Sequence, residues 1–342
     1  MKIAVVASPV TPLRPAQLGG AQAFVSDLAL GLTRRGHDVT LHCSEGSSVE
    51  GVCLAMVPAP PDAAAALVMP GGSSPPSAPG VAAAMEAMFR AIAAEPVDAV
   101  SQHAFDAPAF ELARGLPVLH TLHLPPIVEA VVRAAQAVDA AHLATVSHAA
   151  AKSWRDVGVE VGEVLPNGVP DFDVLEVRPE RVALIAGRIS PEKGIEDALE
   201  AARLAGVPVR VAGAHYDPAY VVDFADAELL GSLPRDQLAA VMARSVVTVC
   251  APRWEEPYGL VAAEAQMAGC PVAAYRRGAL PEVVEEGVSA LLAEPDDIDG
   301  LAEAIRRCMK LDRRGVHDSA VKRLSLDLAV GRYEAALERV TG

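Results

Sequence analysis

Short apolar runs alternate along this chain with longer alanine-rich amphipathic stretches. That alternation is typical of βαβ units, in which helices join parallel strands. Several runs are continuous in Val, Ile, Leu and Ala, so both faces of these strands are expected to lie buried under helices. The sequence therefore predicts an α/β fold with doubly wound parallel sheets. The strands are expected at Ile3–Ala7, Val39–Cys43, Ala99–Gln102, Val118–Leu122, Val182–Ala186, Val209–Ala212, Val246–Cys250 and Val272–Ala274.

The length of 342 residues suits about two such domains. Two segments interrupt the rhythm. Pro58 to Gly80 is rich in Pro, Gly and Ser and is expected to be a surface loop, whereas P-N-G-V-P at 166–170 is expected to begin an interdomain linker. We therefore expect one domain at residues 1–168 and a second at 169–321. The carboxyl ends of their strands are expected to face a cleft between them.

Charge and cysteine content exclude several classes of protein. The chain has 29 basic and 44 acidic residues, a formal charge of −15, and neither half is basic, which argues against a nucleic-acid binder. Its five cysteines are scattered and form no C-x-x-C pair, so a cytoplasmic protein without disulfides or structural zinc is expected. The first ten residues are predicted to form a strand rather than a signal peptide, and no apolar stretch is long enough to span a bilayer.

One candidate anion site follows the fifth expected strand. The strand sequence V-A-L-I-A runs into G-R-I-S-P-E-K-G at 187–194, and an Ala/Leu-rich helix follows. Arg188 and Lys193 stand five residues apart, at the strand end and the helix start. Two cations beside the N–H groups of a helix N-terminus can bind a phosphate or diphosphate. A pair of solvated surface charges is the alternative, and the segment alone leaves both open.

A second group of residues follows the strand V-V-T-V-C. A proline and a glycine break the chain after Glu256, so this carboxylate is expected on a loop. Leu260–Ala268 is expected to be helical and to carry Glu264 about five residues along, ~7.5 Å down the axis. The amides of Leu260 and Val261 then fall between the two carboxylates.

This order of groups has a chemical interpretation. A nucleotide-sugar has its parts in the matching order of sugar, diphosphate and ribose. One acid can bind the hydroxyls of the sugar, the N–H groups can bind the diphosphate, and the second acid can bind the hydroxyls of the ribose. The alternative is that Glu255 and Glu256 cap the helix electrostatically and that Glu264 lies at the surface.

Four segments together resemble a known family. They are G-G-A-Q-A-F-V-S-D-L-A-L-G-L-T-R-R-G-H-D-V near the N-terminus, G-R-I-S-P-E-K-G, G-S-L-P-R-D-Q-L-A-A-V-M-A-R-S and E-P-Y-G-L-V-A-A-E. Their joint occurrence in this order resembles the family 4 retaining glycosyltransferases of the GT-B fold. The resemblance covers most of the chain and implies two Rossmann-like domains facing across a cleft. It also implies that a final helix, at about 322–342, packs back on the N-terminal domain.

The resemblance implies roles for individual residues. Arg188 and Lys193 resemble the cations on the donor diphosphate, and Leu260 and Val261 would add backbone N–H groups. Glu256 resembles the ligand of the donor sugar's hydroxyls. The other implied positions are Glu264 for the ribose, Gly19 and Gly20 for close backbone approach to diphosphate and acceptor, His123 beside the transferred sugar, and Gly213 and the stretch 230–233 with Gly231 around the base.

Three features suggest other interpretations. His103, His120 and His123 could be metal ligands, but His120 and His123 are three apart on a strand and are expected to point to opposite faces. The string Asp171-Phe172-Asp173 matches a D-x-D metal motif of a different glycosyltransferase fold, yet it falls in the expected linker. We therefore expect no metal and no cofactor. Trp254 is expected either to line the sugar pocket or to pack as a buried aromatic.

The expected reaction breaks a sugar–phosphate bond, so stabilising the leaving diphosphate is the main task. Arg188, Lys193 and the helix amides suit it because they are in place before reaction. No convincing carboxylate nucleophile is apparent; Glu256 is the nearest candidate. The sequence thus predicts a retaining, metal-independent glycosyltransferase, with UDP as the expected nucleotide and a hydroxyl acceptor.

The acceptor is expected to be soluble or carrier-borne. The stretch 127–155 has only three Lys or Arg residues, so docking to an anionic membrane is disfavoured. The short, Ala-rich chain also looks similar to sugar-transfer enzymes of antibiotic oligosaccharide pathways of the avilamycin type. The alternatives are a nucleotide-sugar epimerase or phosphorylase on the same scaffold, or a non-catalytic nucleotide-sugar binding module. A nicotinamide dehydrogenase fits less well, because no G-x-G-x-x-G follows the first strand.

Overall fold

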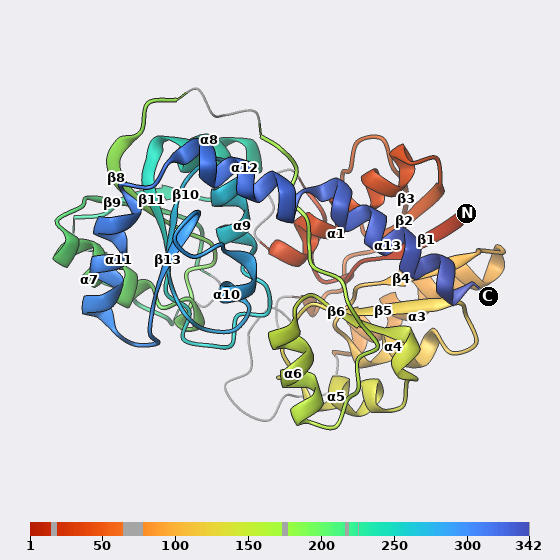
Figure 1. Ribbon diagram of the computed structural model, residues 1–342. Helices are drawn as coiled ribbons and strands as arrows, with labels where there is room; N and C mark the ends of the chain where they lie inside the picture. Colours follow the sequence, from red (N-terminus) through yellow and green to blue (C-terminus); the bar gives the residue numbers. More distant parts are fainter. Residues whose placement is uncertain (15–18, 64–77, 173–176, 216–218, 225, 342) are drawn as a thin grey trace. The chain divides into compact units, whose positions relative to one another are not determined.

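The chain forms two compact α/β units in the computed structural model, which describes residues 1–14, 19–63, 78–172, 177–215, 219–224 and 226–341 (Figure 1). The first unit comprises Met1–Pro15, Ala21–Pro166 and Asp327–Gly342, and the second comprises Ala16–Gly20 and Asn167–Leu326. Much of the expected loop between Pro58 and Gly80, and part of the expected linker with Asp173 of the D-x-D string, lie outside the described residues.

The first unit contains a parallel sheet that has seven strands within the described residues, in the order β3-β2-β1-β4-β5-β6-β7. Its strands are β1 (Lys2–Val6), β2 (Asp38–Ser44), β3 (Cys53–Val57), β4 (Ala99–Gln102), β5 (Val118–Leu122), β6 (Leu143–Thr145) and β7 (Glu163–Val164). Its helices are α1 (Gly20–Arg34), α3 (Pro79–Ala94), α4 (Ala107–Leu112), α5 (Glu129–Gln136), α6 (His148–Asp156) and α13 (Leu326–Val340).

The second unit contains a parallel sheet with six described strands, in the order β10-β9-β8-β11-β12-β13. Its strands are β8 (Glu180–Ala186), β9 (Val209–Ala212), β10 (Glu228–Gly231), β11 (Ser245–Cys250), β12 (Val272–Tyr275) and β13 (Ala290–Ala293). Its helices are α7 (Ile195–Ala205), α8 (Arg235–Arg244), α9 (Leu260–Met267), α10 (Leu280–Val283), α11 (Ile298–Cys308) and α12 (Arg313–Leu324).

Both sheets follow the Rossmann strand order, in which the first strand of the unit lies beside the fourth. In the first unit the strands β1, β2 and β3 follow one another outward to one edge, and the chain then returns to form β4 on the other side of β1. In the second unit β8 and β11 are neighbours in the same way. At such a switch point the connections on either side leave in opposite directions, and a crevice opens at the carboxyl ends of the two central strands. The doubly wound α/β fold predicted from the sequence is confirmed.

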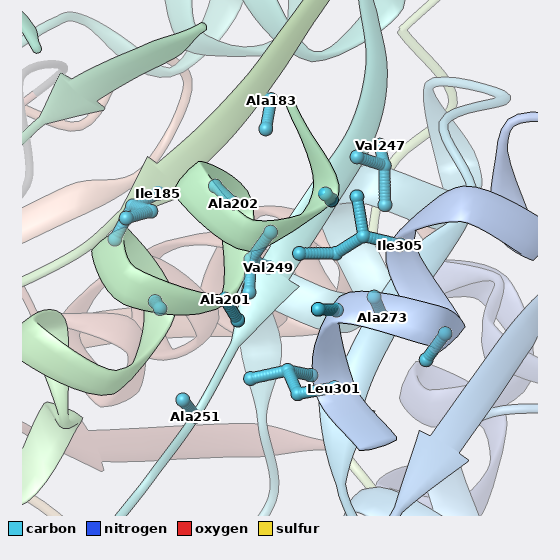
Figure 2. Close-up of a cluster of buried hydrophobic side chains, with 14 of the residues drawn as sticks. Ala183, Ile185, Ala201, Ala202, Val247, Val249, Ala251, Ala273, Leu301 and Ile305 are labelled. Carbon is cyan, nitrogen blue, oxygen red and sulfur yellow. The ribbon is translucent and has the colours of Figure 1, made fainter. Parts of the chain in front are cut away.

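The core of the second unit explains why alanine is so frequent. Ala201 and Ala202 of α7 belong to the same buried cluster as the strand residues Val247 and Val249 (Figure 2). Leu301 and Ile305 of α11 complete this part of the cluster. Small side chains on the helix allow its backbone to come close to the sheet, while the branched residues fill the remaining volume.

Helix α13 packs within the first unit, although most of the second unit precedes it in the chain. Gly31 of α1 makes the contact possible, because a Cβ at this position would lie only 2.5 Å from Cγ2 of Val330. Tyr333 of α13 is fully buried, with its ring centroid 5.4 Å from that of Phe24 on α1.

All eight strands expected from the sequence are present, and three have the expected bounds. The five that were not expected are β3, β6, β7, β10 and β13. Four of these form the edges of the two sheets, and β6 lies beside an edge. β7 has only two residues and no apolar run, whereas C-L-A-M-V of β3 and A-L-L-A of β13 are continuous apolar runs that the sequence reasoning did not assign to strands.

None of the described helices is both long enough and apolar enough to cross a membrane.

Candidate active site

Two loops of the second unit meet at its switch point. The loop after β8 carries Arg188 and Lys193, and the loop after β11 carries Glu256. Because β8 and β11 are hydrogen-bonded neighbours, the sheet brings together two segments that lie more than sixty residues apart in sequence.

Lys193 and Glu256 form a direct ion pair. Lys193 Nζ donates to Glu256 Oε2 at 2.7 Å, and the two side chains are 24% and 12% exposed. Glu256 lies on a loop, as the break in the sequence predicted. The backbone of the β12–α10 connection supports this loop, since the N–H of Ala279 donates to the Glu256 carbonyl at 2.8 Å.

Arg188 has a carboxylate partner of its own. Arg188 Nη2 lies 3.2 Å from Glu192 Oε1, and Ser190 Oγ donates to the same oxygen at 2.6 Å. Both charged side chains are less than one fifth exposed. Each cation predicted to bind phosphate thus has a carboxylate within ion-pair distance. Glu192 is a site residue that the sequence reasoning did not assign.

Trp254 connects the two ion pairs. Its Nε1–H donates to Glu256 Oε2 at 2.8 Å, and its ring lies beneath both cations, 5.1 Å from Lys193 Nζ and 6.0 Å from Arg188 Cζ. Cation–π attraction and the hydrogen bond together hold the three side chains in one arrangement. Trp254 therefore orders the charged groups directly, a role that neither sequence-based interpretation of this residue included.

The charges around Glu256 determine its protonation state. Burial raises the pKa of this carboxyl, but the charge and hydrogen bond of Lys193, the Trp254 N–H and the Arg188 charge together hold the pKa below its ordinary value. Glu256 is therefore ionised at neutral pH and can only accept hydrogen bonds. Burial and the Glu256 charge raise the pKa of nearby Cys250 to about 12, so this thiol stays protonated.

Helix α9 begins at Leu260, as expected, and Glu264 is its fifth residue. The N–H groups of Ala262 and Ala263 both donate to the carbonyl of Gly259. Leu260 and Val261 precede the first helical hydrogen bond, and their N–H groups belong to the positive end of the helix dipole.

Glu264 is buried and bound by a second arginine, so the surface position considered for it is wrong. Arg235 Nε donates to Glu264 Oε1 at 2.7 Å, and the Glu264 side chain is 8% exposed. The guanidinium carbon of Arg235 lies 5.6 Å from the centre of the Phe172 ring. The sequence reasoning did not single out Arg235, which is the first residue of α8.

Three glycines lie together where β8, β9 and β10 end. The N–H of Gly187 donates to the Ala212 carbonyl at 3.0 Å, and the N–H of Gly213 donates to the Gly231 carbonyl at 2.9 Å. A Cβ at Gly213 would overlap the carbonyl oxygen of Gly187. The backbones of two neighbouring strand ends therefore approach each other more closely at Gly213 than any side chain there would allow.

In the first unit, His123 lies directly after β5 and is in contact with His103, which lies directly after β4. His103 Nδ1 and His123 Nε2 are 2.9 Å apart, and His103 Nε2 lies 2.8 Å from Ser101 Oγ. Burial lowers the pKa of His123 to about 4, and burial together with the neighbouring imidazole lowers the pKa of His103 well below its ordinary value. Both rings are therefore neutral at pH 7.

His120 points to the other side of the sheet, as the strand period predicted. Its ring stacks on Phe110 with centroids 4.6 Å apart. No group of three or more His, Cys, Asp or Glu side chains suited to a metal ion occurs among the described residues. Gly19 and Gly20 lie at the start of α1, after the gap at 15–18 in the described chain.

Two family models match the chain and together span nearly all of it. The model described as Glycosyltransferase Family 4 matches residues 18–171, and the model described as Glycosyl transferases group 1 matches residues 171–321. The boundary between the two matches lies in the segment where the structure divides into its second unit.

Curated relatives match in sequence over part of their length. A D-inositol 3-phosphate glycosyltransferase of Mycobacterium marinum is 40% identical over 145 residues, which is 38% of this chain and 31% of that protein. A glycogen synthase of Mycobacterium tuberculosis is 34% identical over 135 residues, 36% of this chain and 32% of that protein. The matched segments thus span about a third of these relatives.

Solved structures match over the whole length. AviGT4, a glycosyltransferase involved in avilamycin A biosynthesis, has a TM-score of 0.76 and 22% identity and covers 99% of this chain and 97% of its own. HepE of Anabaena, solved in complex with UDP and glucose, has a TM-score of 0.71 and 18% identity, with 99% of both chains covered. At these identities the likeness establishes the shared fold.

Proposed function

Because the chain belongs to the glycosyltransferases, with a family 4 part followed by a group 1 part, we propose that it transfers a sugar from a nucleoside-diphosphate sugar to a hydroxyl acceptor, with retention of configuration and without a metal ion. The observation that carries the proposal is the group of two cations, two carboxylates and one indole at the switch point of the second unit.

Arg188 and Lys193 are proposed to bind the donor diphosphate. Each cation has a carboxylate within ion-pair distance, so an incoming diphosphate has to compete with Glu192 and Glu256. The hydroxyls of the donor sugar can offset this competition at Glu256, because an ionised carboxylate accepts hydrogen bonds from them. The amides of Leu260 and Val261 add two donors at the positive end of α9.

The rest of the nucleotide is proposed to lie on the carboxyl ends of β8 to β10. The backbone around Gly213 and Gly231 would hold the base, and Glu264, held in place by Arg235, would accept hydrogen bonds from the ribose hydroxyls. We propose UDP as the nucleotide. The neighbour HepE, solved with UDP and glucose, supports this choice by its shared fold.

The proposed chemistry rests on electrostatic stabilisation of the leaving group. As the bond between the sugar C1 and the phosphate oxygen breaks, negative charge grows on the diphosphate, and Arg188, Lys193 and the α9 amides are already in place to stabilise it. The acceptor oxygen forms the new bond to C1 from the same face, and its proton passes to the departing phosphate oxygen. Glu256 is not proposed as a nucleophile, because Lys193 and Trp254 already hold its Oε2.

We further propose a soluble or carrier-borne acceptor, as in the assembly of antibiotic oligosaccharides, and a cytoplasmic location. The formal charge of −15 supports an enzyme that does not dock on anionic membranes.

A thermal-shift panel of UDP, GDP and TDP, each with and without EDTA, tests the donor site. A ligand at a hundredfold over its Kd adds about 2.7 kcal/mol to the free energy of unfolding. We expect UDP to stabilise the protein most and EDTA to leave that shift unchanged. Uridine, which lacks the diphosphate, is the matched control. Equal stabilisation by uridine would contradict the assignment of Arg188 and Lys193, and loss of the shift in EDTA would contradict the metal-free proposal.

Product analysis tests transfer itself. Incubation with a UDP-sugar should release UDP, slowly into water and faster with an acceptor, and NMR of the product should show the anomeric configuration of the donor. Inversion would contradict the proposed stereochemistry. Binding without any UDP release would identify a binding module, and an isomerised donor without release would identify an epimerase.

A further inference from the structure

Ser101, His103 and His123 form a buried chain of hydrogen bonds across two neighbouring strands. Ser101 lies on β4, and the two histidines are the residues that follow β4 and β5. The contacts are 2.8 Å from Ser101 Oγ to His103 Nε2 and 2.9 Å from His103 Nδ1 to His123 Nε2. At the far end, the buried His123 Nδ1 has no hydrogen-bond partner among the described residues.

The direction of the protons in this chain can be derived from Ser101. Its side chain is completely buried, and its hydroxyl makes its one recorded hydrogen bond, within the described part of the chain, to His103 Nε2. Either direction leaves one donor of this chain unpaired in the free protein: the Ser101 O–H or the His123 Nδ1–H. An O–H of the completely buried Ser101, within β4, would stay unpaired, whereas an N–H of His123, which follows β5 at the carboxyl edge of the sheet, is placed where a Rossmann unit binds its ligand. Ser101 therefore donates, and His103 Nε2 accepts.

The rest of the chain follows from the chemistry of neutral imidazole, in which one ring nitrogen carries a proton and the other accepts. His103 accepts at Nε2, so its proton is on Nδ1, which donates to His123 Nε2. His123 in turn accepts at Nε2 and carries its proton on Nδ1. The unpaired atom at the end of the chain is therefore an N–H donor.

We propose that Ser101 and His103 are positioning residues that fix His123 as the Nδ1–H tautomer, so that this imidazole donates a hydrogen bond to an oxygen of the sugar substrate and does not act as a base. The tautomer rests on a ligand that accepts from His123 at the carboxyl edge of this sheet, and the assignment of that ligand to a sugar oxygen rests on the proposed function. A buried, unpaired N–H of this kind is satisfied when a ligand oxygen binds to it.

The surroundings of the pair keep both rings neutral and in place. Phe24 and Tyr333 flank them, with centroid distances of 6.1 Å from Phe24 to His123 and 5.8 Å from Tyr333 to His103. The low pKa of His123, about 4, means that the neutral form persists throughout the pH range in which the enzyme would be assayed.

Long-range ¹H–¹⁵N NMR of the imidazole rings tests the tautomer directly, and His123→Gln identifies the His123 signals. We expect the native protein to show a protonated Nδ1 and an unprotonated Nε2. Ser101→Ala removes the donor that sets the direction, so the His123 signals should shift toward the other tautomer. Ser101→Thr keeps the hydroxyl and should restore the native pattern.

Ser245→Ala is the matched control. Ser245 is also a completely buried strand serine, but it lies in the second unit and donates to the Val241 carbonyl. This variant should leave the His123 signals unchanged. A native His123 protonated on Nε2, or identical His123 signals in the native protein and Ser101→Ala, would overturn the proposal.

Kinetics test the role in transfer. Ser101→Ala should lower kcat about tenfold, the effect of losing one hydrogen bond that orients a group in the transition state, with little change in the donor KM. The same change introduced into His123→Gln should have no further effect, because the two residues act as one unit. Additive effects would overturn the positioning role. If neither the native protein nor any variant transfers sugar, the proposed function fails, while the NMR result still decides the tautomer.

Discussion

The two units share one fold but differ in the groups at its switch point, which are neutral imidazoles in the first unit and paired charges in the second. Each has the Rossmann strand order, and in each the residues discussed above follow the strands at or beside the switch point. The first unit has two neutral imidazoles there, linked to a serine. The second has two cations paired with two carboxylates around an indole. Topology thus determines where the functional residues lie, and the loop sequences determine what they can bind.

The difference extends to the way each unit tolerates burial of titratable groups. In the first unit four buried histidines, at positions 42, 103, 120 and 123, have lowered pKa values, with burial as the largest cause. In the second unit the charged side chains of the site lie in pairs of opposite charge, and at Glu256 the charges of Lys193 and Arg188 hold the pKa below its ordinary value in spite of burial. The first unit is therefore expected to be sensitive to acid, and the second to the loss of a partner.

The chain has two tryptophans, Trp154 in the first unit and Trp254 in the second. Trp254→Phe leaves a fluorescent reporter for the first unit alone, and Trp154→Phe leaves one for the second. These two backgrounds allow the stability of each unit to be followed separately.

Replacing Tyr333 by Ala should have the largest effect on stability. The fully buried ring fills space between Phe24 and His103, so its loss should lower the free energy of unfolding of the first unit by about 3–5 kcal/mol. Urea denaturation followed by Trp154 fluorescence measures this change, and the transition followed by Trp254 should stay in place. A loss shared equally by both units would show that they do not unfold independently.

Replacing Arg188 by Ala should lower turnover about a hundredfold or more, equivalent to ~3 kcal/mol of transition-state stabilisation, and should leave the fold intact. Steady-state kinetics with a UDP-sugar measure the effect. Arg276→Ala is the control, because Arg276 is a partly exposed arginine of the same unit, paired with Glu286 and Glu294. A loss below threefold in folded Arg188→Ala would refute the assignment of this residue to the leaving group.

Acidification from pH 7 to pH 5 should destabilise the first unit by on the order of 1–2 kcal/mol for each buried histidine. Histidine ordinarily titrates near 6.5, and the folded pKa is about 4 for His42 and His123 and about 3 for His120. Between these values the unfolded chain binds more protons, so stability falls as the pH falls and is fully present above 6.5.

His120→Phe tests this sign, because it keeps a ring against Phe110 and removes the titrating group. The variant should lose less stability than the native protein over the same pH interval, as measured by urea denaturation with Trp154 fluorescence. An unchanged pH dependence would show that His120 does not contribute to the acid sensitivity of the first unit.

Replacing Asp327 by Asn should have the smallest effect. Asp327 lies on the same helix as Tyr333, but its side chain is 85% exposed, and its contact is a surface ion pair with Arg35 at 2.8 Å. Exposed pairs of this kind contribute little. The midpoint of the first unit's unfolding transition should therefore not move measurably, and a clear shift would show that this end of α13 depends on the ion pair.

The central strands and the charged loops could be predicted from the sequence because each carries a local signal. A strand buried on both faces needs a continuous apolar run, and a cation directly after such a run lies at the carboxyl edge by necessity. Arg188 was found in this way, and Lys193 and Glu256 were found further along the loops that follow two such runs. Among the edge strands, β3 and β13 also carry an apolar run and were missed, whereas the two-residue β7 carries none.

The partners of these residues could not be predicted, because pairing depends on the tertiary structure. Arg235 precedes Glu264 by 29 residues, and the fold brings them together. Glu192 stands within the same eight-residue motif as Arg188, but spacing alone does not distinguish a solvated carboxylate from an ion pair. The contact between His103 and His123 could have been predicted from the sequence. Both residues directly follow expected strands, so treating those strands as neighbours would have placed the two rings side by side.

The return of helix α13 to the first unit has a consequence for synthesis on the ribosome. The first 166 residues emerge without the helix that covers Phe24 and His103, and residues 167–326 must be translated before Tyr333 is made. Throughout that interval the nascent first unit has an uncovered apolar surface beside its histidine pair. The second unit, which is continuous from Asn167 to Leu326 apart from a short N-terminal segment, can complete its own core earlier. The order of folding is thus expected to be the reverse of the order of synthesis.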